Sequence, residues 1–237
     1  MDAPAPQTTA RRAAFWRGFA ATLPLQVATI PFGLIFGIVA VETGLDLAQI
    51  VGFTVIVLAG ASSLVAMELI QEQAPALIVI LAGAMVNLRM AMYSAALVPH
   101  WEGVGSGPRW AAGYFLNDQT YTIALKAYED GRLPSRPEKL AYFFGSGCCC
   151  IPGWCLSVFA GVALGAQVPP EWGLDMAAPA LFLALSAPLI RTPAHMIACT
   201  AAVVAALPAT ALPQGIGVIA ASVVGILAGM LAKRVLG

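Results

Sequence analysis

The chain has 237 residues, of which 59% are hydrophobic and 10% are charged, and its mean hydropathy is +0.83. Soluble domains carry about 25% charged residues, so this composition excludes an ordinary water-soluble globule. The charges of twelve basic and twelve acidic residues cancel, so the chain has no excess of positive charge that would favour binding to nucleic acid.

Segments of about 20 apolar residues are long enough to cross the hydrocarbon core of a membrane. The sequence predicts an all-α, polytopic membrane helix bundle, with residues 1–14 as a cytoplasmic tail and 15–237 as a single transmembrane transporter domain. A seven-span arrangement is the alternative to eight spans. The eight predicted spans are 16–41, 49–71, 76–98, 109–127, 139–166, 174–190, 193–212 and 214–234.

Lysine and arginine concentrate on the cytoplasmic side of membrane proteins, so their positions predict the orientation. With eight spans and a cytoplasmic N-terminus, only Arg109 falls outside and Arg89 is embedded, and the C-terminus is also cytoplasmic. The basic residues predicted at the cytoplasmic face are Arg11, Arg12, Arg17, Lys126, Arg132, Arg136, Lys139, Arg191, Lys233 and Arg234.

Proline and glycine patterns give three further expectations. Pro24 and Pro31 predict a break or a packing kink in the first span. A weak likeness between the stretches around Pro31 and Pro152 suggests a four-plus-four internal repeat with both halves in the same orientation. Small residues at every fourth position of the last span (Gly217, Ala221, Gly225, Gly229) predict a helix-packing surface, within the chain or towards another subunit.

Polar residues interrupt two neighbouring spans at their midpoints. Asn87 and Arg89 lie in 76–98, and Asn117 and Asp118 lie in 109–127, so antiparallel spans place them at one depth. Charges inside a membrane are costly and by default mark a substrate or ion pathway. We expect an Arg89–Asp118 ion pair in a cavity, in which arginine binds a carboxylate and aspartate an ammonium group. A structural pair that only holds the bundle together remains the alternative.

Tyrosines extend this polar cluster along the same helix faces. Tyr93 lies one turn beyond Arg89, and Tyr114 and Tyr121 flank Asp118 at helical spacing. Asp118 and, as a minor candidate, His195 could couple transport to protons.

Motifs for other kinds of chemistry are missing from the sequence. It contains no enzyme motif and no metal-ligand spacing, and it implies no cofactor. The five cysteines, all in apolar segments, are expected to be packing residues: Cys148, Cys149, Cys150, Cys155 and Cys199.

The order of several short motifs resembles the AzlC family, the large subunit of branched-chain amino acid exporters. The resemblance rests on 31–33 (Pro-Phe-Gly), 59–62 (Ala-Gly-Ala-Ser) and 87–89 (Asn-Leu-Arg) with Tyr93, and continues through Asp118, Tyr121, Trp154, Gly161, Gly165 and Asp175. It implies a secondary exporter of branched-chain or other small hydrophobic amino acids in the bacterial inner membrane. It also implies a separate, four-span AzlD-type subunit, whose contact we expect at the last-span stripe around Gly225.

Three positions depart from the family's pattern in or near the expected cavity. Ser63, next to Ser62, replaces a glutamine, Met90 replaces a histidine, and Gln119 replaces a glutamate. Both serines join the candidate substrate-binding residues. The departures leave open a different amino acid or analogue as substrate, and a structural or assembly subunit without transport of its own is a further alternative.

Overall fold

The computed structural model describes residues 7–165, 190, 192–209 and 216–236, and the regular secondary structure within these ranges is helical. The predicted all-helical class is therefore confirmed for the described part of the chain. The predicted span 174–190 lies outside the described residues except for Ile190.

The first predicted span is a long apolar rod. Helix α1 (Gln7–Thr22), a 3-10 turn η1 (Leu23–Leu25) and α2 (Gln26–Glu42) follow one another without a loop. Pro24 lies in the 3-10 turn, whereas Pro31 lies inside α2, which continues past it. The structure thus changes helix type at the first proline only.

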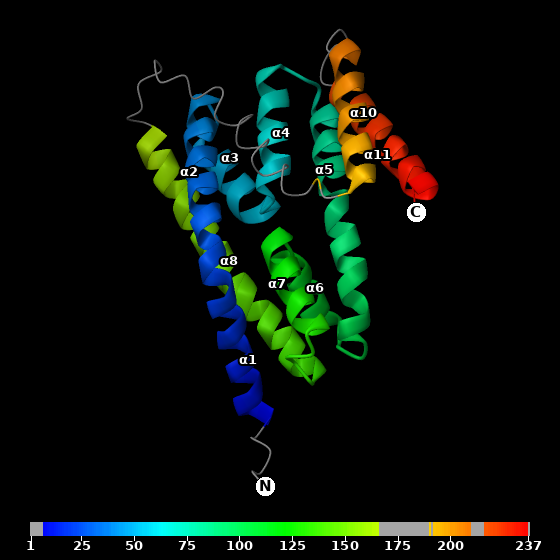
Figure 1. Ribbon diagram of the computed structural model, residues 1–237. Helices are drawn as coiled ribbons and strands as arrows, with labels where there is room; N and C mark the ends of the chain where they lie inside the picture. The colour runs from blue at the N-terminus through cyan, green and yellow to red at the C-terminus, as the bar shows by residue number, and fades with distance from the viewer. Residues whose placement is uncertain (1–6, 166–189, 191, 210–215, 237) are drawn as a thin grey trace.

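A second long helix, α8 (Arg136–Gly165), packs along this rod in parallel orientation (Figure 1). Glycines permit the close approach, because a Cβ at Gly18 would overlap the Tyr142 carbonyl and one at Gly161 would overlap the Leu34 carbonyl. Thr22 and Ser146, both fully buried, join the two helices through a hydroxyl hydrogen bond of 2.7 Å. The equal orientation of α2 and α8 agrees with the predicted repeat, which itself stays a prediction.

The second predicted span, 49–71, is a helical hairpin and not a continuous span. Helix α3 (Leu47–Val51) continues into a π-helical turn η2 (Gly52–Val57) and ends at Leu58, whose φ of 51° is left-handed, before α4 (Gly60–Gln71) begins. The resulting hairpin occupies the upper half of the molecule in Figure 1.

Packing shows that this hairpin enters and leaves at the same end. Ile50 of α3 and Met67 of α4 both belong to the core cluster around Phe36, near the end of α2. Gly60, between them, lies beside Trp154 and beside Phe32, which is one turn before Phe36 along α2. We call 47–71 the upper hairpin.

Helix α5 (Ala76–Leu97), extended by the 3-10 turn η3 (Val98–Trp101), runs the full length of the molecule in the direction opposite to α1 and α2. Its middle contacts the upper hairpin through Asn87, and its end belongs to the same buried cluster as Ala14 near the start of α1. The predicted span is confirmed as a helix. Eight alternating spans would make it parallel to the first span, but it runs antiparallel to α1 and α2, because the preceding hairpin does not cross.

The fourth predicted span, 109–127, is a second hairpin. Helix α6 (Ser106–Phe115) and α7 (Asp118–Glu129) are separated by Leu116 and Asn117, which have extended backbone conformations. Gly147, in the middle of α8, lies beside Phe115, whereas Tyr128 lies near the start of α8, so both helices occupy the end where α1 begins. We call 106–129 the lower hairpin (Figure 1).

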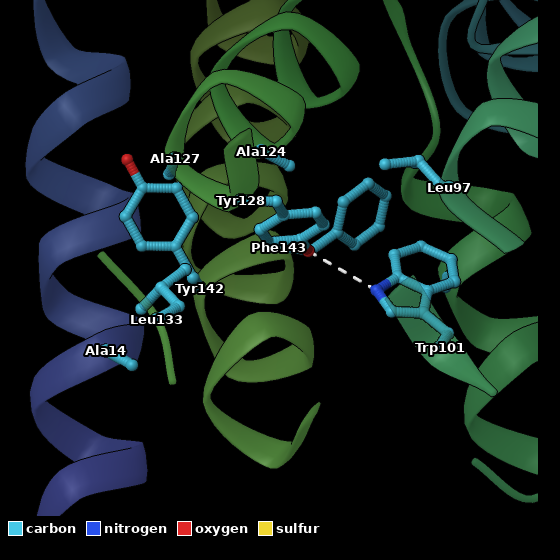
Figure 2. Close-up of a cluster of buried hydrophobic side chains, with 10 residues drawn as sticks. Ala14, Leu97, Trp101, Ala124, Ala127, Tyr128, Leu133, Tyr142 and Phe143 are labelled. Carbon is cyan, nitrogen blue, oxygen red and sulfur yellow. Dashed lines mark hydrogen bonds between the residues drawn. The ribbon is translucent and has the colours of Figure 1, made fainter. Parts of the chain in front are cut away.

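An aromatic cluster closes this lower end (Figure 2). Phe143 is fully buried at its centre, and the Trp101 indole N–H donates a hydrogen bond of 3.3 Å to the Tyr128 hydroxyl. Arg109 donates to the Trp101 carbonyl at 3.0 Å. Arg109 therefore lies at the same end as the other basic residues of 7–165 apart from Arg89, and its predicted placement on the opposite side is wrong.

Helices α10 (Pro193–Ala209) and α11 (Ile216–Leu236) form an antiparallel pair. A Cβ at Gly225 would come within 2.8 Å of the Ala202 Cβ, and one at Gly229 within 2.9 Å of the Ala198 Cβ. The glycine stripe thus packs inside the chain, and the expectation that Gly225 contacts a partner subunit is wrong.

Three helical stretches in the described residues are long and apolar enough to cross a membrane: Thr8–Glu42, Ala76–Trp101 and Arg136–Gly165. Two of the eight predicted spans are hairpins, so the helical membrane bundle stands while its count of eight crossing helices is not reproduced in this part of the chain. The reason is local. A left-handed residue at 58 and a capped helix start at 117 interrupt segments that are apolar enough to span.

Candidate functional site

A cavity of about 510 Å³ lies where the tips of the two hairpins approach each other between α2, α5 and α8. This volume is within the range of small-molecule sites, about 300–1,000 Å³. Its lining residues come from five parts of the chain: Ala28, Thr29, Phe32, Leu58, Ala59, Gly60, Ala61, Val86, Arg89, Met90, Tyr93, Asn117, Asp118, Gln119, Thr122, Cys150, Ile151 and Trp154.

The predicted ion pair is present in this cavity. Arg89 Nη2 of α5 lies 3.1 Å from Asp118 Oδ2 of α7, and the side chains are 30% and 48% exposed. Both residues line the cavity, so the pair is not packed into a dry interface. Arg89 Nε is buried and has no hydrogen-bond partner among the described residues. The guanidinium therefore keeps a donor that the pair does not use.

One tyrosine binds the Asp118 carboxylate, and a second tyrosine stacks on the first. The Tyr93 hydroxyl donates to Asp118 Oδ1 at 2.8 Å, so Arg89 and Tyr93 engage different oxygens of Asp118. Tyr121 stacks on Tyr93 with ring centroids 4.1 Å apart, although it does not line the cavity itself. Tyr114, expected on the same face, belongs to the separate helix α6, and its hydroxyl donates to the Val55 carbonyl of the upper hairpin at 2.9 Å.

Asn117 is the N-cap of α7. Its side-chain oxygen accepts hydrogen bonds from the backbone N–H groups of Gln119 and Thr120, both at 3.0 Å, and Thr120 Oγ1 accepts from the Asn117 backbone N–H. Asp118 in the first turn adds a negative charge where the helix dipole favours one. The polar run at 117–119 thus starts a helix at mid-depth, whereas the sequence predicted a continuous span over 109–127.

The upper tip carries the two predicted serines. Asn87 of α5 donates from Nδ2 to Ser62 Oγ at 3.0 Å and so ties the long helix to the start of α4. Ser63 is 1% exposed, and its hydroxyl has no partner among the described residues. Asn87, Ser62 and Ser63 support the cavity wall from behind and do not line it.

A second polar set faces the cavity from α2 and α8. Gln119 donates from Nε2 to the Thr29 hydroxyl, and the Cys150 thiol donates to Gln119 Oε1 at 3.1 Å. Cys150 was expected to be a packing residue only, but it also lines the cavity and bonds a residue of the lower hairpin. Sequence reasoning missed Thr29, Cys150 and Gly60 as cavity residues, because nothing in their spacing distinguishes them from helix packing.

The remaining sequence candidates lie elsewhere. His195 is in the first turn of α10, where its backbone N–H donates to Thr192 Oγ1 at 3.3 Å, and it does not line the cavity. Pro24 and Pro31 belong to the rod beside the site and do not line the cavity either. Among the departures from the family's pattern, Met90 and Gln119 line the cavity and Ser63 does not.

An apolar helical bundle that encloses a polar, charged cavity between two interrupted helices has the architecture of a membrane transport protein. Comparison with known proteins gives the family. Residues 24–168 match the family model described as AzlC protein, and the chain belongs to the AzlC family. The resemblance identified from its motifs is thereby confirmed, and the chain has a membrane transport-related role.

One curated relative covers most of the chain. "Inner membrane protein YgaZ" from Escherichia coli (strain K12) is 28% identical over 218 residues, which are 90% of this chain and 87% of that protein. No solved structure matches the chain.

Proposed function

We propose that the protein is a secondary transporter that exports branched-chain or other small hydrophobic amino acids across the bacterial inner membrane. The observation that carries this proposal is the charge content of the cavity. Its lining contains one cation, Arg89, and one anion, Asp118, surrounded by apolar side chains. Such a lining is neutral overall and complements a zwitterion with an apolar side chain. Family membership and the similarity to an inner membrane protein support the same assignment.

The ends of the described bundle suggest its orientation. Apart from Arg89, the basic residues of 7–165 lie at the end where α1 begins, and acidic residues such as Asp46 and Glu72 lie at the other. By the positive-inside rule, the α1 end faces the cytoplasm. The upper hairpin then enters from outside and the lower hairpin from the cytoplasm. The position of the C-terminus relative to the membrane stays a prediction.

Energy coupling belongs to the same proposal. No nucleotide-binding motif occurs in the sequence, so energy coupling is ion-driven or resides in another subunit, and Asp118 is the candidate proton-binding group for ion-driven export. A small four-span subunit of the AzlD type completes the transporter. Because the glycine stripe of α11 packs on α10, this subunit contacts a different surface.

Export is tested by feeding a leucine-containing dipeptide to cells that lack the protein and measuring leucine inside and outside. Re-expression of the wild type with its partner should lower intracellular leucine, whereas Asp118→Asn, made at equal membrane abundance, should not. Unchanged efflux upon re-expression would refute the assignment. A panel of amino acids in proteoliposomes then separates the branched-chain substrates from other amino acids and analogues.

A further inference from the structure

The two helices that begin at the cavity, α4 and α7, differ in whether a side chain accepts hydrogen bonds from their first backbone N–H groups. The first backbone N–H groups of any α-helix have no partner within the helix, and they attract negative charge. At α7, the Asn117 side chain accepts from two of these groups and Asp118 supplies a charge. At α4, the N-cap position is Ala59, which provides no side-chain hydrogen bond.

The uncapped N-terminus of α4 opens into the cavity. Ala59, Gly60 and Ala61 line it, although α4 has 12 residues and would be stabilised by a cap. Gly60 also fixes the shape of this wall, because a Cβ there would come within 2.6 Å of the Phe32 ring and 2.9 Å of the Trp154 ring. The tip of the upper hairpin therefore presents backbone donors to whatever enters the cavity.

A second, independent donor lies beside this tip. Trp154 is 7% exposed and lines the cavity, and its buried indole Nε1 has no hydrogen-bond partner among the described residues. A buried donor without a partner is costly, and buried indole N–H groups usually find one. The other buried tryptophan of the described residues, Trp101, satisfies its Nε1 with the Tyr128 hydroxyl. Trp154 thus carries a buried donor that no described residue satisfies.

We propose that the α4 N-terminus, the Trp154 indole N–H and the Arg89 guanidinium form a carboxylate subsite. Arg89 contributes through Nε, which has no partner, while Nη2 stays paired with Asp118. This inference rests on the proposed function and deepens it, because it gives the bound amino acid a direction. Its carboxylate points to the upper hairpin, and its ammonium group points to Asp118 at the lower hairpin.

The experiment measures equilibrium binding by calorimetry to the detergent-solubilised full chain. Three ligands share one side chain: leucine, 4-methylpentanoate without the amine, and isopentylamine without the carboxylate. Trp154→Phe keeps an aromatic ring and removes the donor together with part of the indole ring, and Trp101→Phe makes the same change in size outside the cavity. We expect its affinity for leucine and 4-methylpentanoate to fall tenfold or more, as loss of a charge-assisted hydrogen bond implies, and its affinity for isopentylamine to stay unchanged.

Two further variants supply a control outside the cavity and an independent test of the α4 N-terminus. Trp101→Phe removes an indole N–H outside the cavity and should leave binding of all three ligands unchanged. Ala59→Asn gives α4 the cap that α7 already has, so the variant should fold at least as stably and bind both carboxylate ligands more weakly.

The outcomes of these binding measurements test the carboxylate subsite and the proposed function separately. Leucine binding that neither Trp154→Phe nor Ala59→Asn weakens would overturn the carboxylate subsite and leave the proposed function intact. A wild-type chain that binds 4-methylpentanoate but not leucine would overturn the proposed substrate and keep the subsite. A wild-type chain that binds neither ligand would overturn both.

Discussion

Neutralising the two cavity charges one at a time and together distinguishes a substrate site from a structural ion pair. In Arg89→Gln, Asp118 keeps the Tyr93 hydrogen bond and loses its cation. In Asp118→Asn, Arg89 is left without an anion. Exposed pairs contribute about 0–1 kcal/mol, and breaking a buried pair costs about 3–5 kcal/mol. With side chains 30% and 48% exposed, each single variant should lose about 1–2 kcal/mol.

For a chain of this length, 1 kcal/mol corresponds to a Tm change of about 2–4 °C, so each single variant should melt about 2–8 °C lower. The double variant Arg89→Gln/Asp118→Asn leaves no unpaired charge and should regain most of this stability. Transport in proteoliposomes should nevertheless be lost in all three variants, because under the proposed function both charges bind the substrate. A double variant that transports at nearly the wild-type rate would refute the binding role and leave the pair a structural one.

Four further substitutions, at three positions, test the packing and the helix start that shape the site. Gly161→Ala places a Cβ against the Leu34 carbonyl, which cannot move away easily, so we expect a loss of about 1–3 kcal/mol in thermal unfolding. Gly83→Ala meets no atom within 4 Å and should be neutral or more stable by up to about 1 kcal/mol; an equal loss in both variants would contradict the packing argument. Asn117→Ala removes the cap of α7 and should cost about 1 kcal/mol, whereas Asn117→Ser retains a cap and should melt close to the wild type. Equal melting of the two position-117 variants would show that the cap does not stabilise α7.

Composition and periodicity were sufficient for the class of fold, because apolar segments of about 20 residues have few alternatives to helices. The pairing of Arg89 with Asp118 also followed from the sequence, since opposite charges at one depth in an apolar bundle attract each other strongly. The direction in which α5 runs could not be predicted from the sequence. Segment 49–71 is long and apolar enough to span, and only its packing against α2 shows that it turns back.

The turns of the two hairpins differ in how clearly the sequence predicts them. Asn117 followed by Asp118 and, at the third position, Thr120 is a recognisable helix start, and reading it as a cap would have predicted the lower hairpin. The upper turn has no comparable signal. Leu58 adopts φ of 51° although leucine rarely does so, and this conformation depends on its tertiary surroundings and not on its own preference.

Gln119 leaves Asp118 as the single acid of the cavity lining, and its amide makes hydrogen bonds that an ionised glutamate could not all make. Its amide both donates and accepts a hydrogen bond, since Nε2 donates to Thr29 Oγ1 while Oε1 accepts from the Cys150 thiol. An ionised glutamate at this position accepts hydrogen bonds but donates none, and it would place a second negative charge next to Asp118. Because residue 119 is a glutamine, Asp118 is the one acidic residue of the lining and Arg89 the one basic residue. The cavity is therefore neutral overall. Under the proposed function, a cavity lined by one cation and one anion should favour zwitterions with apolar side chains over amino acids that carry an additional positive charge.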